Sequence, residues 1–329
     1  MQSRETSVVG HDAQVIPLSV RTGSPPALGE SLTRLSEQFL RSQDIKKSSK
    51  TTYRRCLRRF IRWVSKAGVW GPTREDILTY KNNLIGAGLS SATVSAYLVV
   101  VRRFFEWLEG MKLYPNVAKG IKGGKRPRGF RKDPLTVDQV LKLLRSVCRD
   151  DLTGKRDFAL LNLLIRTGIR SIEARRANIG DIRQNTGETV LWVEGKGRDS
   201  KDEFVVLTQN ALKPITEYLQ ELGEKSESAP LFASLSNRNR DERLTTQSIA
   251  AIVRSYLQRI GVSSNRITPH SLRHTAITLS LIAGASIQEA RALGRHSDIN
   301  TTLTYAHNID RIARAPERKI DELLGEAER

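Results

Sequence analysis

Apolar residues recur at helical spacing from about residue 30 to residue 117. The third of four such segments begins at Thr73, a residue type that caps helix N-termini, and the fourth ends at Gly110, a residue type common at helix C-termini. The spacing predicts a small helical bundle. The inward stripes of its first two helices are expected to be Leu32, Leu35, Phe39 and Leu40, and then Tyr53, Leu57, Phe60, Ile61 and Val64.

A second folded unit is predicted to begin near Leu135. Thr136 and Gln139 have the spacing of a capping box, and apolar residues follow at helical spacing. Residues 156–176, RDFALLNLLIRTGIRSIEARR, predict a buried helix, a Thr-Gly turn and another helix, and residues 189–207 predict a β-hairpin around a polar turn. Because the pattern after residue 210 is mostly helical, this unit is expected to be α+β with a small sheet.

Two stretches have no apolar period and mark the boundaries of these units. Residues 1–29 predict a flexible arm, and residues 118–133, rich in Gly, Pro, Lys and Arg, predict a basic linker. The expected division is therefore an arm, a helical domain over 30–117, the linker, and a second domain over 134–329. The linker suits a hinge that closes two domains around a duplex, although its basic residues also suit solubility or a targeting signal.

Composition is that of a soluble globular protein, with 39% apolar and 27% charged residues. No apolar run approaches the roughly 20 residues that a membrane span needs, and the N-terminus does not have the pattern of a secretory signal, so a cytoplasmic location is expected. Cys56 and Cys148 lie in separate apolar patterns. Both are expected to be core residues, with neither a disulfide nor a metal cluster.

The net charge of +19 and the pI near 10.3 indicate a polyanionic partner. Nucleic acid is favoured over an anionic membrane surface, because aromatic residues make up only 6% of the chain. One uninterrupted basic stripe on the second helix suits a phosphate backbone, although a solvated helix face is the alternative. The candidate DNA-binding residues are Arg55, Arg58, Arg59 and Arg62 in this stripe, and Lys125, Arg126 and Arg128 in the linker.

Four of the five histidines fall between residues 270 and 307, a clustering that core packing does not require. His270 and Arg273 are three residues apart on a predicted helix, so their side chains share one face. An isolated pair of this kind is more often a surface ion pair or hydrogen bond than a functional site. It indicates a functional site only together with the motifs around it.

Those motifs resemble the tyrosine recombinases, the family of phage-type integrases and Xer-type recombinases. RTGIRSIEA is similar to the family's first arginine box, VEGKG to its hairpin lysine, PHSLRHTAIT to its HxxR box, and GRHSDINTTLTYAH to the segment with its last histidine and its nucleophile. The resemblance covers residues 30 to about 310. It implies a mainly α fold with a small β-sheet, made of an N-terminal helical core-binding (SAM-like) domain and an α+β catalytic domain.

The resemblance also implies the site residues, and elementary chemistry favours the same set. Two arginines offset the negative charge that grows on a phosphodiester under attack, without a metal or another cofactor. A phenol with a pKa of about 10 needs a proton acceptor, for which His270 is a candidate, and the leaving 5′-hydroxyl needs a donor such as Lys196. The implied catalytic residues are Arg170, Lys196, His270, Arg273, His296 and Tyr305, with Tyr305 as the nucleophile.

Several of these residues have alternative interpretations. Arg170 suits a simple ion pair with Glu173, and Lys201 lies close enough to Lys196 to compete for its role. Glu173 is expected to support the active-site arginine rather than to exchange protons. His274 is expected to be a packing or supporting residue.

One departure from the family pattern concerns the turn before His296. The family usually has glycine there, whereas this chain has Arg295, with Gly294 one residue earlier. Because glycine supplies backbone conformations that other residues avoid, the turn is expected to be rearranged. The step from His296 to Tyr305 nevertheless has the family's length.

The expected function is that of a site-specific DNA recombinase, which cleaves and rejoins strands through a 3′-phosphotyrosyl intermediate and a Holliday junction in DNA integration and excision or in dimer resolution. Its expected partners are double-stranded DNA and its own copies, as a tetramer on two DNA sites that exchanges a C-terminal helix. The apolar residues expected in this segment are Ile312, Ile320, Leu323 and Leu324. No membrane or small-molecule partner is expected, and the protein is expected to be associated with the nucleoid. The alternatives are a type IB topoisomerase and a DNA-binding protein without cleavage activity.

Overall fold

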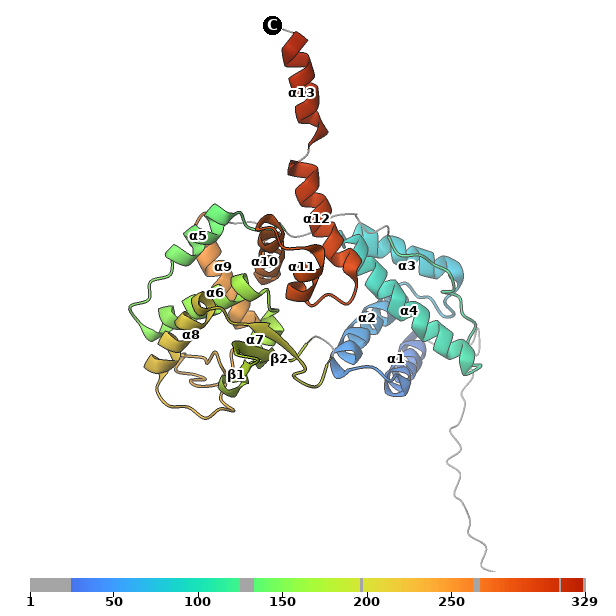
Figure 1. Ribbon diagram of the computed structural model, residues 1–329. Helices are drawn as coiled ribbons and strands as arrows, with labels where there is room; N and C mark the ends of the chain where they lie inside the picture. Colours follow the sequence, from blue (N-terminus) through green and yellow to red (C-terminus); the bar gives the residue numbers. More distant parts are fainter. Residues whose placement is uncertain (1–24, 125–132, 196–197, 263–266, 314, 328–329) are drawn as a thin grey trace, which may run out of the picture. The chain divides into compact units, whose positions relative to one another are not determined.

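The computed structural model describes residues 25–124, 133–195, 198–262, 267–313 and 315–327. The chain forms two compact units, residues 1–128 and residues 129–329, and each is described by itself (Figure 1). Among the helices in these described ranges, none is long and apolar enough to cross a membrane.

The N-terminal unit is the helical bundle that the apolar pattern predicts. The predicted stripes lie inside it, with Leu57, Phe60 and Val64 buried, and the third helix has a capping box formed by Thr73 and Asp76. Aromatic rings fill much of the core; Phe60, for example, packs edge-on against Tyr80 with ring centroids 5.1 Å apart. The four helices are α1 (Pro25–Ser42), α2 (Lys47–Lys66), α3 (Arg74–Gly86) and α4 (Ser91–Gly110).

Both ends of this unit extend beyond the predicted limits. Helix α1 begins at Pro25, inside the predicted arm, because proline is tolerated in the first helical turn, where its missing N–H would have no partner. At the other end, Ala118 and Ile121 are buried in the bundle core, and Arg102 donates to the Ile121 carbonyl at 3.2 Å. The first part of the predicted linker therefore packs on the helices, because its two apolar residues have a core to enter.

The C-terminal unit is organised around one buried helix, α6, which packs against α5, α8 and α10. The capping box of Thr136 and Gln139 is confirmed at the start of α5, and α6 ends at Gly168, whose left-handed φ of 61° is the conformation that favours glycine. The helices are α5 (Val137–Arg145), α6 (Leu152–Thr167), α7 (Ser171–Arg176), α8 (Gln209–Leu222), α9 (Thr246–Arg259), α10 (Pro269–Ile282), α11 (Ile287–Gly294), α12 (Ile299–Ala313) and α13 (Pro316–Ala327), with a 3₁₀ turn at Ile179–Asp181.

A small antiparallel sheet lies beside these helices. Its order is β1 (Ile182–Asn185), β2 (Glu188–Val193) and β3 (Glu203–Val206). The predicted hairpin is confirmed as β2 and β3, which pair Leu191 with Val205. Strand β1 was not expected, since only one of its four residues is apolar and an edge strand leaves no strong apolar alternation in the sequence.

The two cysteines differ from each other. Cys56 is buried in α2 as expected, whereas Cys148 is exposed, which corrects the expectation of a core residue. Helix α5 ends at Arg145, and in the turn that follows Val147 takes the inward position, so that Cys148 faces outward with its thiol against Asp150 at 2.8 Å.

One buried hydrogen bond ties the start of the C-terminal unit to α10. The Leu135 N–H donates to the Thr275 hydroxyl at 2.8 Å, and that hydroxyl donates to the Ser271 carbonyl at 2.8 Å. Thr275 is fully buried, so water cannot replace it. The bond therefore holds the first residues of the unit onto the helix that carries the HxxR box.

Replacing Thr275 with valine is expected to lower the free energy of unfolding by about 1–3 kcal/mol, because it leaves the buried Leu135 N–H without an acceptor while keeping the side-chain shape. Denaturant unfolding measures the change. The matched control is Thr216→Val, at an exposed hydroxyl on α8, for which a change within about 0.5 kcal/mol is expected. Equal losses in the two variants would contradict the role of the buried bond.

Candidate active site

Arg170 stands at the N-terminus of α7, just after the turn that ends α6. Its backbone N–H donates to Glu173 Oε2 at 2.7 Å, and its Nη1 donates to Glu173 Oε1 at 2.6 Å. Glu173 is completely buried, whereas the Arg170 side chain is 24% exposed. The expected ion pair between the two is present, and it holds the guanidinium at the edge of a cavity rather than against the protein interior.

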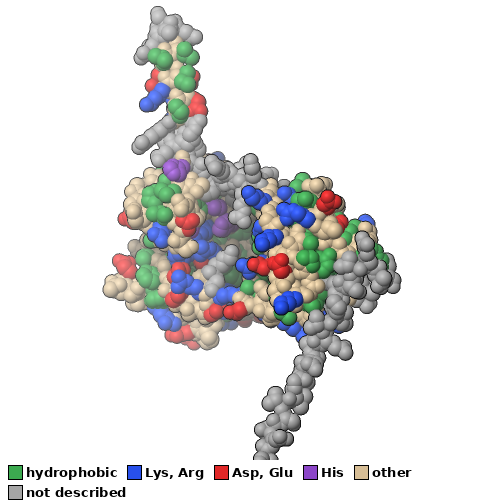
Figure 2. Space-filling model, turned by 90° about the vertical axis from the view of Figure 1, so that its right-hand side faces the viewer, with side chains coloured by type: hydrophobic (Ala, Val, Ile, Leu, Met, Phe, Trp, Pro, Cys, Tyr) green, Lys and Arg blue, Asp and Glu red, His purple; other side chains and the backbone are tan. Residues whose placement is uncertain are grey.

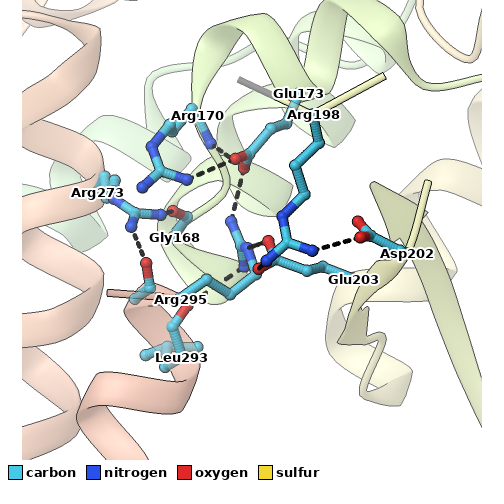
Figure 3. A network of polar contacts seen from close by, with 10 residues as sticks. Gly168, Arg170, Glu173, Arg198, Asp202, Glu203, Arg273, Leu293 and Arg295 are labelled. Carbon is cyan, nitrogen blue, oxygen red and sulfur yellow. Dashed lines mark hydrogen bonds and ion pairs between the residues drawn. The ribbon is translucent and has the colours of Figure 1, made fainter. Parts of the chain in front are cut away.

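Arg273, on α10, has a buried guanidinium that joins three segments of the chain. Its Nη1 donates to the Gly168 carbonyl at 2.6 Å, and its Nη2 donates to the Gly294 carbonyl (Figure 3). Burial, together with the positive charges of Arg170 and Arg295, lowers the pKa of Arg273 to about 10. The guanidinium still carries its charge near neutral pH, and the two carbonyl dipoles fix its plane.

Tyr305 lies on α12 with its ring buried against Ile277 and Ala290. Its hydroxyl forms a hydrogen bond with Nδ1 of His274, one turn beyond His270 on α10. Burial raises the pKa of Tyr305 to about 12, although the charges of Arg273 and Arg170 act in the opposite direction. The tyrosine is therefore held in place as a neutral phenol, and a phenol in this state would need a proton acceptor to react as a nucleophile.

His274 is the histidine that contacts the Tyr305 hydroxyl, whereas the sequence predicts it to be a packing or supporting residue. Burial, and then the charges of His270, Arg273 and His296, lower the pKa of His274 to about 4, so its ring is neutral near pH 7. The His270 ring lies edge-on to it with centroids 4.7 Å apart, and the His270 side chain is exposed. Sequence spacing shows that the two histidines share a helix face, but not which of them points at α12.

His296 occupies the turn between α11 and α12. Its Nδ1 is 2.9 Å from the Thr302 hydroxyl, and its ring stacks on that of Tyr305 with centroids 6.1 Å apart. Burial, and then the charges of Arg273, Arg170 and Arg295, lower the pKa of His296 to about 4 as well. Thr302 is one of the two adjacent threonines of GRHSDINTTLTYAH, and its buried hydroxyl orients the imidazole.

Gly294 and Arg295 explain how the turn accommodates the departure from the family pattern. Arg295 itself takes the left-handed conformation, with φ 45° and ψ 52°, and it caps α11. This conformation costs a residue other than glycine about 1–2 kcal/mol. Gly294 leaves room for the imidazole, since a Cβ there would lie 2.9 Å from His296 Cε1. The turn before His296 is thus formed, and Arg295 is the residue with the strained backbone.

The Arg295 side chain lies at the cavity, a position that the family motifs do not predict. It is only 6% exposed, and its Nη2 donates to Glu173 Oε2 at 2.6 Å (Figure 3). Burial alone would raise the pKa of Glu173, but the charge of Arg295 and then the hydrogen bonds and charge of Arg170 outweigh burial, so the net effect lowers it. The single carboxylate is therefore shared by two guanidinium groups.

These side chains surround one cavity of about 270 Å³. It brings together five of the six predicted catalytic residues, while Lys196 lies outside the described residues. Lys201, its rival, forms an ion pair with Asp181. The lining residues are Arg170, His270, Arg273, His274, Arg295, His296, Ser297, Thr301 and Tyr305.

The predicted basic stripe lies on α2. Arg55, Arg58 and Arg62 are exposed, whereas Arg59 is partly buried, with its guanidinium carbon 5.4 Å from the centre of the Tyr97 ring. Figure 2 shows Lys and Arg side chains spread over the face that it draws. The basic linker residues Lys125, Arg126 and Arg128 lie outside the described residues.

Comparison with known proteins shows the family to which the chain belongs. Residues 134–311 match the phage integrase family, and residues 32–114 match the phage integrase N-terminal SAM-like domain. The tyrosine recombinase XerD of Bifidobacterium longum is 31% identical over 291 residues, which are 84% of this chain and 92% of that protein. The tyrosine recombinase XerC of Thermodesulfovibrio yellowstonii is 34% identical over 229 residues, 67% of this chain and 72% of that protein.

Solved structures show the same fold. The XerH site-specific recombinase bound to palindromic difH substrate, in a post-cleavage complex, has a TM-score of 0.73 at 20% identity, over 92% of this chain and 99% of that one. A lambda integrase tetramer bound to a Holliday junction has a TM-score of 0.67 at 18% identity, over 84% of this chain and 76% of that one.

The chain therefore belongs to the phage integrase family, the tyrosine recombinases. More particularly, it is an enzyme of the Xer type, and its activity is site-specific DNA recombination.

The low histidine pKa values predict how stability depends on pH. In the unfolded chain a histidine binds a proton at about pH 6.5, whereas His274 and His296 in the folded protein do so only at about pH 4. The unfolded state therefore binds more protons in this window, and stability falls as the pH falls from about 6.5 to about 4, by on the order of 1–3 kcal/mol for each histidine. Denaturant unfolding across this range measures the loss.

The double variant His274→Asn/His296→Asn is expected to lose less stability than the wild type over the same window. The matched control is His307→Asn, which removes an exposed imidazole two residues beyond Tyr305. An acid dependence as steep in the double variant as in the wild type would show that these two histidines are not the source.

Proposed function

We propose that this recombinase cleaves each DNA strand by attack of Tyr305 on the scissile phosphate, with Arg170, Arg273, His270, His274 and His296 around the reacting atoms. The observation that carries the proposal is the cavity in which the Tyr305 hydroxyl, held by a histidine, faces the two arginines of the family motifs. In the reaction the Tyr305 oxygen forms a bond to phosphorus, and the bond from phosphorus to the 5′-oxygen breaks. The products are a 3′-phosphotyrosyl link and a 5′-hydroxyl.

The arginines supply the electrostatic part of the mechanism. Negative charge grows on the non-bridging phosphate oxygens during attack, and preorganised guanidinium donors stabilise it at little reorganisation cost. Arg273 is fixed by the Gly168 and Gly294 carbonyls, and Arg170 is fixed by Glu173. The two guanidinium groups are thus held in place before DNA binds.

Proton transfer is assigned to the histidines and to Lys196. His274 is neutral near pH 7 and lies on the Tyr305 hydroxyl, so it is placed to accept the phenolic proton, with His270 beside it. Entry of a phosphate brings negative charge next to the imidazoles and raises their pKa, which favours this transfer. The leaving 5′-oxygen takes its proton from Lys196, as the family resemblance implies.

Rejoining reverses these steps. The phosphotyrosyl bond keeps the energy of the broken phosphodiester, so a 5′-hydroxyl of the partner duplex attacks phosphorus and releases Tyr305. Exchange in two rounds passes through a Holliday junction, and the fold shared with the lambda integrase tetramer on such a junction supports this order. Biological roles in integration and excision or in dimer resolution both follow from this chemistry.

DNA binding and assembly are assigned to surfaces away from the cavity. The arginine stripe of α2 and the basic linker are proposed to contact the phosphate backbone, in keeping with the net charge of +19 and a nucleoid-associated protein. Helix α13 exposes Ile320, Leu323 and Leu324 along an apolar side. We assign this side to contacts between subunits of a tetramer on two DNA sites.

The Tyr305→Phe variant tests the cleavage step. Wild-type protein is incubated with a pool of randomised duplexes, and covalent adducts that survive denaturation are collected and their DNA is sequenced. The site obtained is then made as a nicked suicide substrate. Wild type is expected to form an adduct on it, and Tyr305→Phe is expected to bind the same DNA without an adduct, because phenylalanine has no attacking oxygen.

Three outcomes would contradict the proposal. Binding without any adduct by the wild type would indicate a DNA-binding protein that does not cleave. An adduct with Tyr305→Phe would place the nucleophile elsewhere. Relaxation of one supercoiled duplex with no exchange between two duplexes would indicate a topoisomerase.

The His274→Ala variant tests the proton acceptor. Cleavage of the suicide substrate in a single turnover is expected to slow by about 10²-fold or more at neutral pH, since the Tyr305 proton then has no adjacent acceptor. The rate of the variant is expected to rise with pH towards the Tyr305 pKa of about 12. His307→Ala, at the exposed histidine, is the control. If His270→Ala slows cleavage while His274→Ala does not, the acceptor is His270.

A further inference from the structure

Arg295 is the one arginine of the cavity that the family pattern does not contain. Its backbone has a φ of 45°, a conformation that glycine adopts without strain, and yet its side chain turns inward and is 6% exposed. Its Nη2 donates to Glu173 Oε2 at 2.6 Å, and its Nη1 donates to the Leu293 carbonyl at 3.2 Å. A residue that combines a strained backbone with a buried, hydrogen-bonded side chain at a site is a candidate for a functional role.

The partner of Arg295 is also the residue that orients Arg170. Glu173 accepts from the Arg170 side chain on one oxygen, and it accepts from the Arg170 backbone and from Arg295 on the other. Of the three guanidinium groups at the cavity, that of Arg170 is the most exposed, at 24%, so it depends most on this carboxylate for its position. Figure 3 shows Glu173 between the two arginines.

We propose that Arg295 is a positioning residue for strand cleavage, which fixes the buried Glu173 carboxylate and thereby holds the Arg170 guanidinium towards the scissile phosphate. The inference rests on the proposed function of the cavity. It makes Arg295 a positioning residue and not a catalytic one, because the role assigned to it acts through Glu173 and not on the phosphate.

The charge of Arg295 is the property that this role requires. Among the described residues, the charged groups that act on Glu173 are Arg170 from the start of α7, Arg295 from the end of α11 and Arg273 from α10. Burial favours the protonated carboxyl, and the charge of Arg295 is the largest single influence that opposes burial, followed by the two hydrogen bonds and the charge of Arg170. A protonated Glu173 would have one oxygen fewer to accept from Arg170, so the guanidinium would lose part of its support.

A second carboxylate near Arg295, that of Glu203, does not have the hydrogen-bond geometry of Glu173. Glu203 Oε2, on β3, lies 3.7 Å from Arg295 Nε, and that Nε has no hydrogen-bond acceptor among the described residues. Glu203 also pairs with Arg198, at 3.3 Å, and is 26% exposed. The hydrogen-bonded connection therefore runs to Glu173. Arg198 offers a control arginine, because it lines the neighbouring cavity and, among the described residues, forms its ion pairs with Asp202 and Glu203.

The test compares Arg295→Gln, Arg295→Lys and Arg295→Gly in single-turnover cleavage of the suicide substrate as a function of pH, with DNA binding measured separately. Glycine suits the backbone conformation, so that variant is expected to fold. The glutamine and glycine variants are expected to cleave about 10- to 100-fold more slowly near neutral pH with unchanged DNA affinity. Lysine keeps the charge and is expected to restore part of the rate.

The pH profile separates positioning from a purely structural role. Without Arg295 the pKa of Glu173 rises, so Glu173 takes up its proton at higher pH and the acid limb of the cleavage profile moves to higher pH. Glu173→Gln is expected to lack this limb, and adding Arg295→Gln to it is expected to cause no further loss. The control Arg198→Gln is expected to keep the wild-type acid limb.

Unchanged cleavage and an unchanged acid limb in Arg295→Gln would overturn the inference. So would a loss of the same size at every pH, or a loss fully explained by weaker DNA binding. In these cases wild type still forms the adduct that Tyr305→Phe lacks, so the proposed function stands while the role of Arg295 does not.

A measurement without DNA keeps the inference testable if wild type forms no adduct. In the wild type the ionised Glu173 contributes stability above its unfolded pKa, and this contribution is lost as the pH falls through its lower folded pKa. The difference in unfolding midpoint between wild type and Arg295→Gln is therefore expected to be larger near pH 7 than near about pH 4. A difference independent of pH would overturn the link between Arg295 and Glu173.

Discussion

The balance of charge around one buried carboxylate is the constraint on which this active site depends. Arg170, Arg273 and Arg295 bring three guanidinium groups to a cavity of about 270 Å³, and Glu173 is the carboxylate hydrogen-bonded to two of them. Burying such charges is costly unless dipoles or counter-charges compensate them. The Gly168 and Gly294 carbonyls do so for Arg273, and in the proposed reaction a phosphate of the DNA compensates the excess positive charge.

The protonation state of the histidines follows from this excess of positive charge. Burial and the nearby arginines lower the pKa of His274 and His296 to about 4, so both rings are neutral in the absence of DNA. Neutral rings avoid adding further positive charge to the cavity, and they can accept hydrogen bonds, as His274 does from Tyr305 if the phenol donates. A phosphate in the cavity would raise these pKa values, so in the proposed reaction the substrate itself prepares the proton acceptor.

The architecture and most of the site residues could be predicted from the sequence, because they are local. The helical stripes, the capping box at Thr136 and the hairpin each depend on residues a few positions apart, and three of the four short motifs contain the residues that line the cavity. The contact between His274 and Tyr305 could not be predicted in this way. It joins α10 to α12 and depends on the rotation of both helices, which spacing leaves open.

The turn before His296 shows why a departure from a motif can leave its geometry intact. A glycine in that turn can serve two needs, a left-handed backbone and space for the imidazole, and here two residues divide them. Gly294 gives the space, since a Cβ there would lie 2.9 Å from the ring, and Arg295 takes the left-handed conformation. The ion pair of Arg295 with Glu173 offsets that strain, so His296 still stacks on Tyr305 and still binds Thr302.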